Sequence, residues 1–101
     1  MVRVRTHIMF QGDAEEALAL YARVFEDFKV MDVERYGAGE ERPEGALKLA
    51  SVTFAGHELL VFDSPPIHQF TFTPAMSLFV DFESEQAFEA AFRKLAEGGK
   101  V

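Results

Sequence analysis

The chain has no cysteine, no tryptophan and no apolar run near the roughly 20 residues of a membrane-spanning helix. Without cysteine, disulfides and thiolate chemistry are excluded, and a metal would need histidine, carboxylate or water as ligands. A protein that is stable without disulfides suits the cytoplasm, where we expect it. The opening residues, MVRVRTHIMF, are too short and too often interrupted by Arg and His to predict a signal peptide.

Basic residues are also few: 10 Lys and Arg against 17 Asp and Glu give a net charge of -7, and the basic residues are scattered. A nucleic-acid surface needs a basic stripe that displaces counterions, so we expect no nucleic-acid partner, and no membrane partner either. The acidity favours solubility. The 101 residues are 49% hydrophobic and include 11 Phe, which suffices for the modest core of one small domain.

One segment occurs twice at a shift of 70 positions: residues 7–25, HIMFQGDAEEALALYARVF, match residues 77–95, SLFVDFESEQAFEAAFRKL. Glu, Ala and Arg recur at Glu15 and Glu85, Ala17 and Ala87, and Arg23 and Arg93. Each copy is typical of a strand, a turn and an amphipathic helix. Because one repeated unit cannot bury its sheet face alone, the repeat indicates two units that pack together.

The first copy predicts a strand over Val2–Phe10, with one apolar face and one mixed face. The mixed face holds Arg3, Arg5, His7 and Met9. Asp13 is the predicted N-cap of a helix from Ala14 to about Phe25, and Glu16 has the spacing of a capping box. Tyr21 lies in the apolar stripe of this helix, so we expect it in the core.

Three more strands are predicted: Phe28–Tyr36 near a sheet edge, then Leu47–Phe54 and Glu58–Asp63, joined as a hairpin. The run LLVF in the last of these is typical of a strand covered on both faces. Gly37–Ala46 is a predicted loop, either a solvated connection or a segment that closes over a ligand. Residues 67–75, IHQFTFTPA, are expected to form an extended linker with an aromatic edge.

The second copy predicts a strand over Ala75–Phe82, an N-cap at Ser84, a helix over Glu85–Glu97 and a C-cap at Gly98 and Gly99. Residues 1–70 thus predict one complete βαβββ unit with its linker, and residues 75–101 the start of another. We expect a single α+β domain of paired βαβββ units, with the second unit incomplete in this chain.

Four stretches together resemble a known superfamily: FQGDAEEALALYARVFED, ERYGAGE, PEGALKLASVTFAGHELLVFDSP and HQFTFTPAMSLFVDFESE. They are similar to the vicinal oxygen chelate proteins, which include glyoxalase I, bleomycin-resistance proteins and extradiol dioxygenases. The nearest branch is the glyoxalase-like one often labelled 3-demethylubiquinone-9 3-methyltransferase. The resemblance implies a homodimer in which two βαβββ units form a cup, with helices outside and a ligand inside. No glycine-rich loop for S-adenosylmethionine is found, so the residues themselves do not support methyl transfer.

The resemblance places the mixed strand face toward the cup. Expected ligand-binding residues are therefore Arg5, His7 and Met9, and the repeat adds Ser77 and Phe79 at the same parity. Phe70 and Phe72 could line a pocket or pack in the core. His57 and His68 are candidates for acid and base chemistry, or simply surface residues.

Superfamily metal sites take ligands from the first, fourth, fifth and eighth strands. His7, or Thr6 one residue earlier, is the candidate on the first strand, and Glu58 or Asp63 on the fourth. Ser77, which the repeat pairs with His7, is a poor ligand for a divalent metal. The leading hypothesis is therefore a small-molecule-binding protein of unassigned activity, and the alternative is a metal-dependent lyase, isomerase or dioxygenase.

Overall fold

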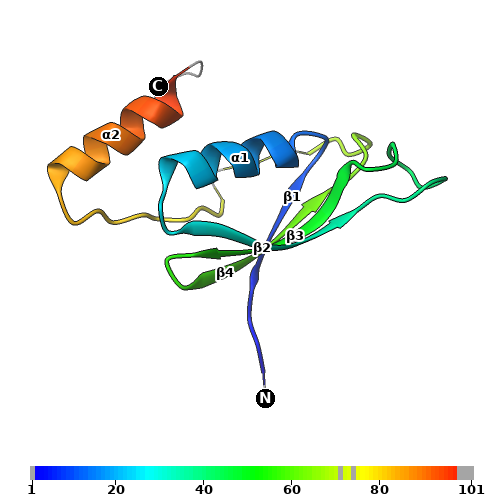
Figure 1. Cartoon of the computed structure of the whole chain (residues 1–101), viewed down its shortest axis with the longest axis horizontal. Helices are drawn as coiled ribbons and strands as arrows, with labels where there is room; N and C mark the ends of the chain where they lie inside the picture. Colours follow the sequence, from blue (N-terminus) through cyan, green and yellow to red (C-terminus); the bar gives the residue numbers. More distant parts are fainter. Residues whose placement is uncertain (1, 71, 74, 98–101) are drawn as a thin grey trace. The chain divides into compact units, whose positions relative to one another are not determined.

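A computed structural model describes residues 2–70, 72–73 and 75–97 of the chain (Figure 1). The elements are β1 (Thr6–Phe10), α1 (Ala14–Val24), β2 (Phe28–Arg35), β3 (Leu47–Phe54), β4 (His57–Asp63) and α2 (Glu85–Ala96). The chain divides into two compact units, residues 1–70 and residues 71–101. The predicted α+β class and the βαβββ order of the first unit are confirmed.

The first unit contains a four-stranded sheet in the order β1-β4-β3-β2. Strand β1 pairs parallel with β4, whereas β3 pairs antiparallel with both β4 and β2. The predicted hairpin between β3 and β4 is confirmed, and its two turn residues, Ala55 and Gly56, have φ of 49° and 84°. Positive φ at both central residues matches the right-handed twist of the paired strands. Strand β2 lies at the sheet edge, as predicted.

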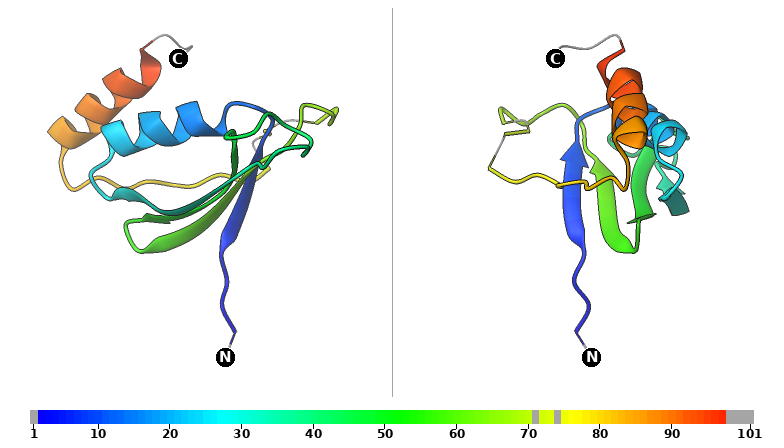
Figure 2. Two further views of the ribbon diagram at one scale, coloured as in Figure 1. Left: turned by 45° about the vertical axis from the view of Figure 1, so that its right-hand side comes forward. Right: turned by 90° about the vertical axis from the view of Figure 1, so that its left-hand side faces the viewer.

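Helix α1 covers one face of this sheet (Figure 2). The core between them comprises Phe10, Ala14, Leu18, Phe28, Leu47, Ala50, Val52, Leu59 and Val61. Ala14 is fully buried, and its small side chain lets the helix start close to the sheet. Tyr21 packs against this core, with its ring centroid 5.6 Å from that of Phe28, which confirms its predicted packing role.

The other face of the sheet is less covered. In β4, Leu59 and Val61 are buried under α1, whereas Leu60 and Phe62 are only partly buried. The prediction that both faces of this strand are covered is therefore wrong for the described residues. Strand alternation sends every second side chain to the face opposite α1, and no helix of the first unit lies there (Figure 2).

The first strand begins at Thr6 rather than at the predicted Val2. Its pairing with β4 starts at Thr6 and Leu59, and the preceding residues extend away from the sheet (Figure 1). Val2 and Val4 are 88% and 84% exposed, so their apolar alternation does not reflect burial. Alternation indicates an extended chain, but a strand also needs a neighbour to form its ladder.

In the second unit, the predicted strand at Ala75–Phe82 is wrong, because these residues form no ladder with any described segment. The N-cap at Ser84 is confirmed: its Oγ accepts a hydrogen bond from the Ala87 N–H at 3.1 Å. The expected C-cap at Gly98 and Gly99 lies outside the described residues. Neither described helix has the length and apolarity needed to cross a lipid bilayer.

Candidate functional site

The sheet face opposite α1, called the open face below, carries the expected ligand-binding residues of the first unit. Ile8 and Phe10 pack toward the core, so alternation turns His7 and Met9 to the open face. Pairing places His7 beside Leu60 and Met9 beside Phe62. The rings of His7 and Phe62 are stacked at 27°, with centroids 6.4 Å apart.

Strand β3 extends this surface, because Ser51 lies opposite Leu60 and Leu49 lies opposite Phe62. Leu49, Leu60 and Phe62 are all partly buried. They form an apolar floor on hydrogen-bonded strands, with the imidazole of His7 at its β1 side. The backbone ladder holds these side chains in fixed positions, which is what a ligand-binding surface requires.

One end of the open face is charged. The Arg3 guanidinium donates to both carboxylate oxygens of Glu58, with Nε to Oε2 at 2.9 Å and a terminal nitrogen to Oε1 at 3.0 Å. This bidentate contact, with a smaller electrostatic contribution from Arg5, lowers the pKa of the Glu58 carboxyl below its ordinary value. Glu58, the candidate metal ligand of the fourth strand, is therefore already occupied by a cation of the same chain.

Thr6 and His57 lie elsewhere. Their positions alternate with those of the open face, and the Thr6 Oγ1 and His57 Nε2 atoms are 2.9 Å apart. Thr6, the other candidate metal ligand of the first strand, is thus bonded to a side chain at the hairpin end of the sheet. His57 is exposed, as expected for a residue next to a turn.

Asp63 ends β4 on the α1 side of the sheet and is 2% exposed. Its Oδ1 accepts the Gly12 N–H at 2.6 Å, and its Oδ2 accepts the Ala14 N–H at 3.4 Å. Arg42 donates to Oδ2 at 2.8 Å. The structure therefore places Asp63 away from His7, and directs its carboxylate to the start of α1 instead.

This arrangement corrects the predicted helix cap. Asp13 makes no side-chain capping bond, so the capping box with Glu16 is wrong, and Asp63 supplies the carboxylate at the helix N-terminus instead. The helix dipole favours a negative charge at that position. An anionic cofactor group has no free N–H donors at Gly12 and Ala14, because Asp63 already accepts from both.

The predicted loop at residues 37–46 is tied to the first unit by side chains. Besides the Arg42 contact with Asp63, Lys48 donates to Glu40 at 2.8 Å and the Gly37 N–H donates to the other Glu40 oxygen at 2.5 Å. Lys48 and Gly37 lower the pKa of the Glu40 carboxyl. These contacts hold the loop against the rest of the first unit.

Tyr36 and Gln11 make further contacts around β4 and the β1–α1 turn. The Tyr36 hydroxyl donates to the Asp63 carbonyl at 2.6 Å, and burial raises the pKa of this phenol. The Gln11 amide donates to the Phe70 carbonyl at 2.8 Å and accepts the His68 N–H at 3.0 Å. The rings of His68 and Phe70 lie tilted at 34° to each other, with centroids 4.9 Å apart, and the contacts with Gln11 hold this part of the linker to the first unit.

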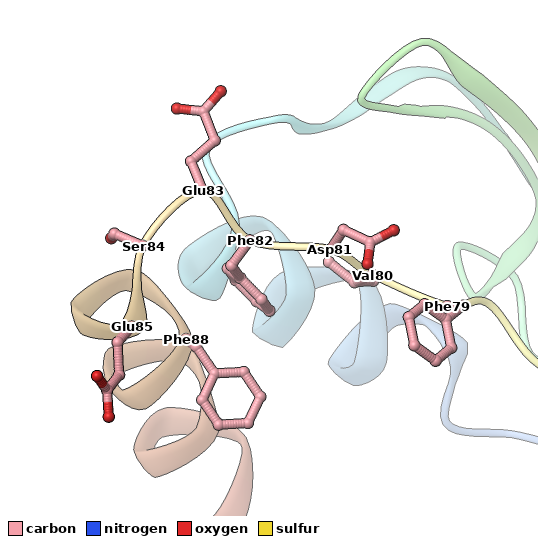
Figure 3. A pocket seen from close by; sticks show the side chains of 8 residues that line it. All are labelled: Phe79, Val80, Asp81, Phe82, Glu83, Ser84, Glu85 and Phe88. Carbon is pink, nitrogen blue, oxygen red and sulfur yellow. The ribbon is translucent and has the colours of Figure 1, made fainter.

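Ser77 and Phe79 belong to the second unit and are exposed. An open depression of about 390 Å³ in that unit is lined by Phe79, Val80, Asp81, Phe82, Glu83, Ser84, Glu85 and Phe88 (Figure 3). The rings of Phe82 and Phe88 meet edge to face, with centroids 5.7 Å apart. Ser77 does not line this depression, and Phe72 is exposed as well.

Metal ligands are not gathered in the part of the chain that the structure describes: no three His, Asp or Glu side chains are placed to hold one ion. His7 and Glu58 do share the open face, because Glu58 lies two residues before Leu60, the neighbour of His7. Asp63 lies on the other face.

A family model described as 3-demethylubiquinone-9 3-methyltransferase matches residues 2–101. The chain belongs to this glyoxalase-like family. A solved PhnB protein from Bacillus cereus with the same methyltransferase label is 39% identical, with a TM-score of 0.85 over 94% of this chain and 74% of that one. A Staphylococcus aureus protein is 26% identical, with a TM-score of 0.51 over 92% and 66% of the two chains. Comparison with curated proteins gave no match.

Sequence reasoning about this family member missed the contacts of Asp63 with Gly12, Ala14 and Arg42. A signal was present, since an acid that ends an apolar strand and precedes Ser64-Pro65 is placed to be buried. Its partners lie 21 to 51 positions away in the sequence, so only the folded chain identifies them. The buried hydroxyl of Tyr36 was missed for the same reason.

Proposed function

We propose that this family member binds a small molecule on the open face, as a glyoxalase/bleomycin-resistance-like protein of unassigned activity. The observation that carries the proposal is the partly buried apolar floor of Leu49, Leu60 and Phe62, bordered by His7. Ligand sites in proteins are mostly apolar surfaces with a few placed polar groups. A floor built on paired strands needs little reorganisation, which lowers the cost of binding.

A titration of small aromatic compounds, followed by amide NMR shifts and thermal unfolding, tests this proposal. Binding to the native state raises the melting temperature, and the largest shifts are expected at His7, Leu60 and Phe62. The variant Leu60→Asn should weaken binding, because it puts a polar amide into the floor. The matched control is Val33→Asn on β2, which pairs with Ala50 of the core face and should not change binding. Equal losses in both variants, or no ligand that stabilises the protein, would contradict the proposal.

A metal-dependent lyase, isomerase or dioxygenase is the second candidate, and the shared face of His7 and Glu58 favours it. A divalent metal there would have to replace Arg3 on the Glu58 carboxylate. Elemental analysis of purified protein distinguishes the two candidates. Stoichiometric zinc, nickel, manganese or iron that is lost in His7→Ala would support the enzyme, whereas metal content unchanged by that substitution would contradict the use of His7.

We also propose that the chain forms a homodimer. The support is the exposed apolar surface among the described residues, including Phe88 and Phe92 on α2, which are 51% and 47% exposed. Large exposed apolar patches are typical of association surfaces. Size-exclusion chromatography with light scattering should give the mass of two chains, and Phe92→Gln should shift the equilibrium toward one chain. A monomer at all concentrations would contradict this proposal.

A further inference from the structure

We propose that the open face selects an anionic aromatic small molecule, and that Arg5 pairs with its negative charge. This inference rests on the proposed function and adds the chemical class of the ligand. It is carried by the distribution of charge around the apolar floor. The chain has a net charge of -7. Three cations of the first unit, Arg3, Arg5 and Lys29, nevertheless lie at one end of this face.

The strand register defines that end. Glu58 lies opposite Thr53, and Thr53 lies opposite Lys29, so these three residues share one row across the open face. Arg5 lies one position before Thr6, and Thr6 pairs with Leu59, one position after Glu58, so the chain brings Arg5 to the same end. The charge of Arg5 also contributes to the lowered pKa of Glu58. Arg3 and Arg5 thus act on the Glu58 carboxylate, and Lys29 lies in the same row two strands away.

Arg3 already neutralises that carboxylate through two hydrogen bonds. Across the described ranges, neither Arg5 nor Lys29 forms an ion pair. Two positive charges are therefore left at this end without a carboxylate of their own. The guanidinium is the stronger candidate, because it stays charged at any physiological pH and matches a carboxylate with two parallel donors.

Carboxylates lie along the β2 edge of the open face. Glu34 lies opposite Leu49, in the row of Phe62 that is farthest from Glu58, and Asp32 lies opposite Ser51, in the row of Leu60. A negative group on the ligand is repelled from these two carboxylates and attracted to Arg5. The charge gradient along the floor therefore orients the ligand as well as selecting its sign.

The apolar floor also indicates the size and the aromatic character of the ligand. Successive rows on one face of a strand are about 7 Å apart, so Leu60 and Phe62 lie one and two rows from the Glu58 row. A one-ring or two-ring aromatic acid can cover Leu60 and reach the stacked rings of His7 and Phe62, while its carboxylate stays beside Arg5. Aromatic rings gain from offset stacking on other rings beyond the apolar area that they bury.

The test compares 2-naphthoate with 2-naphthamide, which have the same shape and differ in charge. Calorimetric titration of the full chain should give naphthoate an affinity about tenfold higher, as a charge-assisted bidentate contact implies. Arg5→Gln should reduce naphthoate to the level of naphthamide and leave naphthamide unchanged, and Arg5→Lys should keep part of the preference. Arg23→Gln, in the last turn of α1, is the control that removes an equal charge elsewhere. Amide spectra of each variant establish that it is folded.

Each possible result either supports or overturns the proposal that Arg5 selects an anionic ligand. A naphthoate preference that Arg5→Gln abolishes and Arg23→Gln preserves supports it. Equal affinity for the two compounds overturns the anion selectivity while leaving small-molecule binding intact. Binding of neither compound overturns both the inference and the proposed function. Naphthoate binding that weakens as protein concentration rises would identify a second copy of the chain as the occupant, and would overturn the inference too.

Discussion

At the scale of single residues, Asp63 links segments of the first unit that lie far apart in the sequence. Its carboxylate accepts hydrogen bonds from the Gly12 and Ala14 N–H groups and from Arg42, and its carbonyl accepts the hydroxyl of Tyr36. A buried carboxylate is costly unless hydrogen bonds and a cation replace its water. The contacts of Asp63 meet this need, and they also fix the start of α1 against the end of β4.

We predict that Asp63→Asn lowers the free energy of unfolding by about 2–4 kcal/mol. The amide keeps one acceptor oxygen, turns an NH₂ group toward donors, and leaves the charge of Arg42 unpaired. Urea unfolding followed by circular dichroism measures the change. Asp32→Asn, on the exposed strand β2, is the control and should stay within about 0.5 kcal/mol of the unmodified chain. Similar losses in both variants would show that Asp63 has no special structural role.

A second residue-scale prediction concerns Glu58 and pH. Arg3 lowers the pKa of the Glu58 carboxyl, so the pair stabilises the fold above the ordinary pKa of a glutamate and loses this effect as pH falls through the lowered value. A carbon-13 NMR titration of the Glu58 carboxyl should show the depressed pKa. Arg3→Gln should raise it toward the ordinary value, whereas Arg23→Gln should leave it unchanged. A Glu58 pKa unaffected by the loss of Arg3 would refute the pairing.

At the scale of elements, the two helices begin in different ways. The Ser84 hydroxyl caps α2, whereas the Asp13 side chain caps nothing and α1 is capped from β4. We predict that Ser84→Ala destabilises α2 by about 1 kcal/mol, and that Asp13→Ala costs α1 only the few tenths that its charge contributes. Amide hydrogen exchange within each helix measures both effects. A larger loss for Asp13→Ala would contradict this assignment of the caps.

The elements of the first unit could be predicted because their signals are local. Alternation, helical periodicity and the Ala55-Gly56 turn each specify a conformation over a few residues. The start of β1 and the strand at Ala75–Phe82 could not be predicted this way, because a strand forms only where another strand offers its hydrogen bonds. Apolar alternation is the same with or without that neighbour.

The candidate site, too, could be predicted from the sequence only where its signals are local. That His7 and Met9 face away from α1 follows from alternation alone. The pair of Arg3 with Glu58, and the capping of α1 by Asp63, depend on which strands become neighbours, and local patterns do not contain that information. The role proposed for Arg5 likewise depends on the strand register, which places Glu58, Thr53 and Lys29 in one row.

At the scale of the whole molecule, burial is unequal between the two compact units. All nine residues of the main hydrophobic core belong to residues 1–70. In α2, by contrast, Ala91 is the only buried residue among those described. Because buried apolar area supplies most of the stability, the two units should differ in the free energy needed to open them.

We therefore predict that amide hydrogen exchange separates the units. Amides of β3 and β4 should exchange only through global unfolding, since these strands lie inside the sheet and carry most of the core. Amides of α2 should exchange through a smaller opening with a lower free energy and a weaker dependence on denaturant, because that opening exposes less surface. Exchange measured by NMR at several low urea concentrations gives both quantities for each amide. Equal free energies and equal urea dependence for β3 and α2 would contradict this prediction, because they would mean that the whole chain unfolds in one cooperative step. The exposed phenylalanines of α2 would then indicate an association surface rather than a weakly held helix.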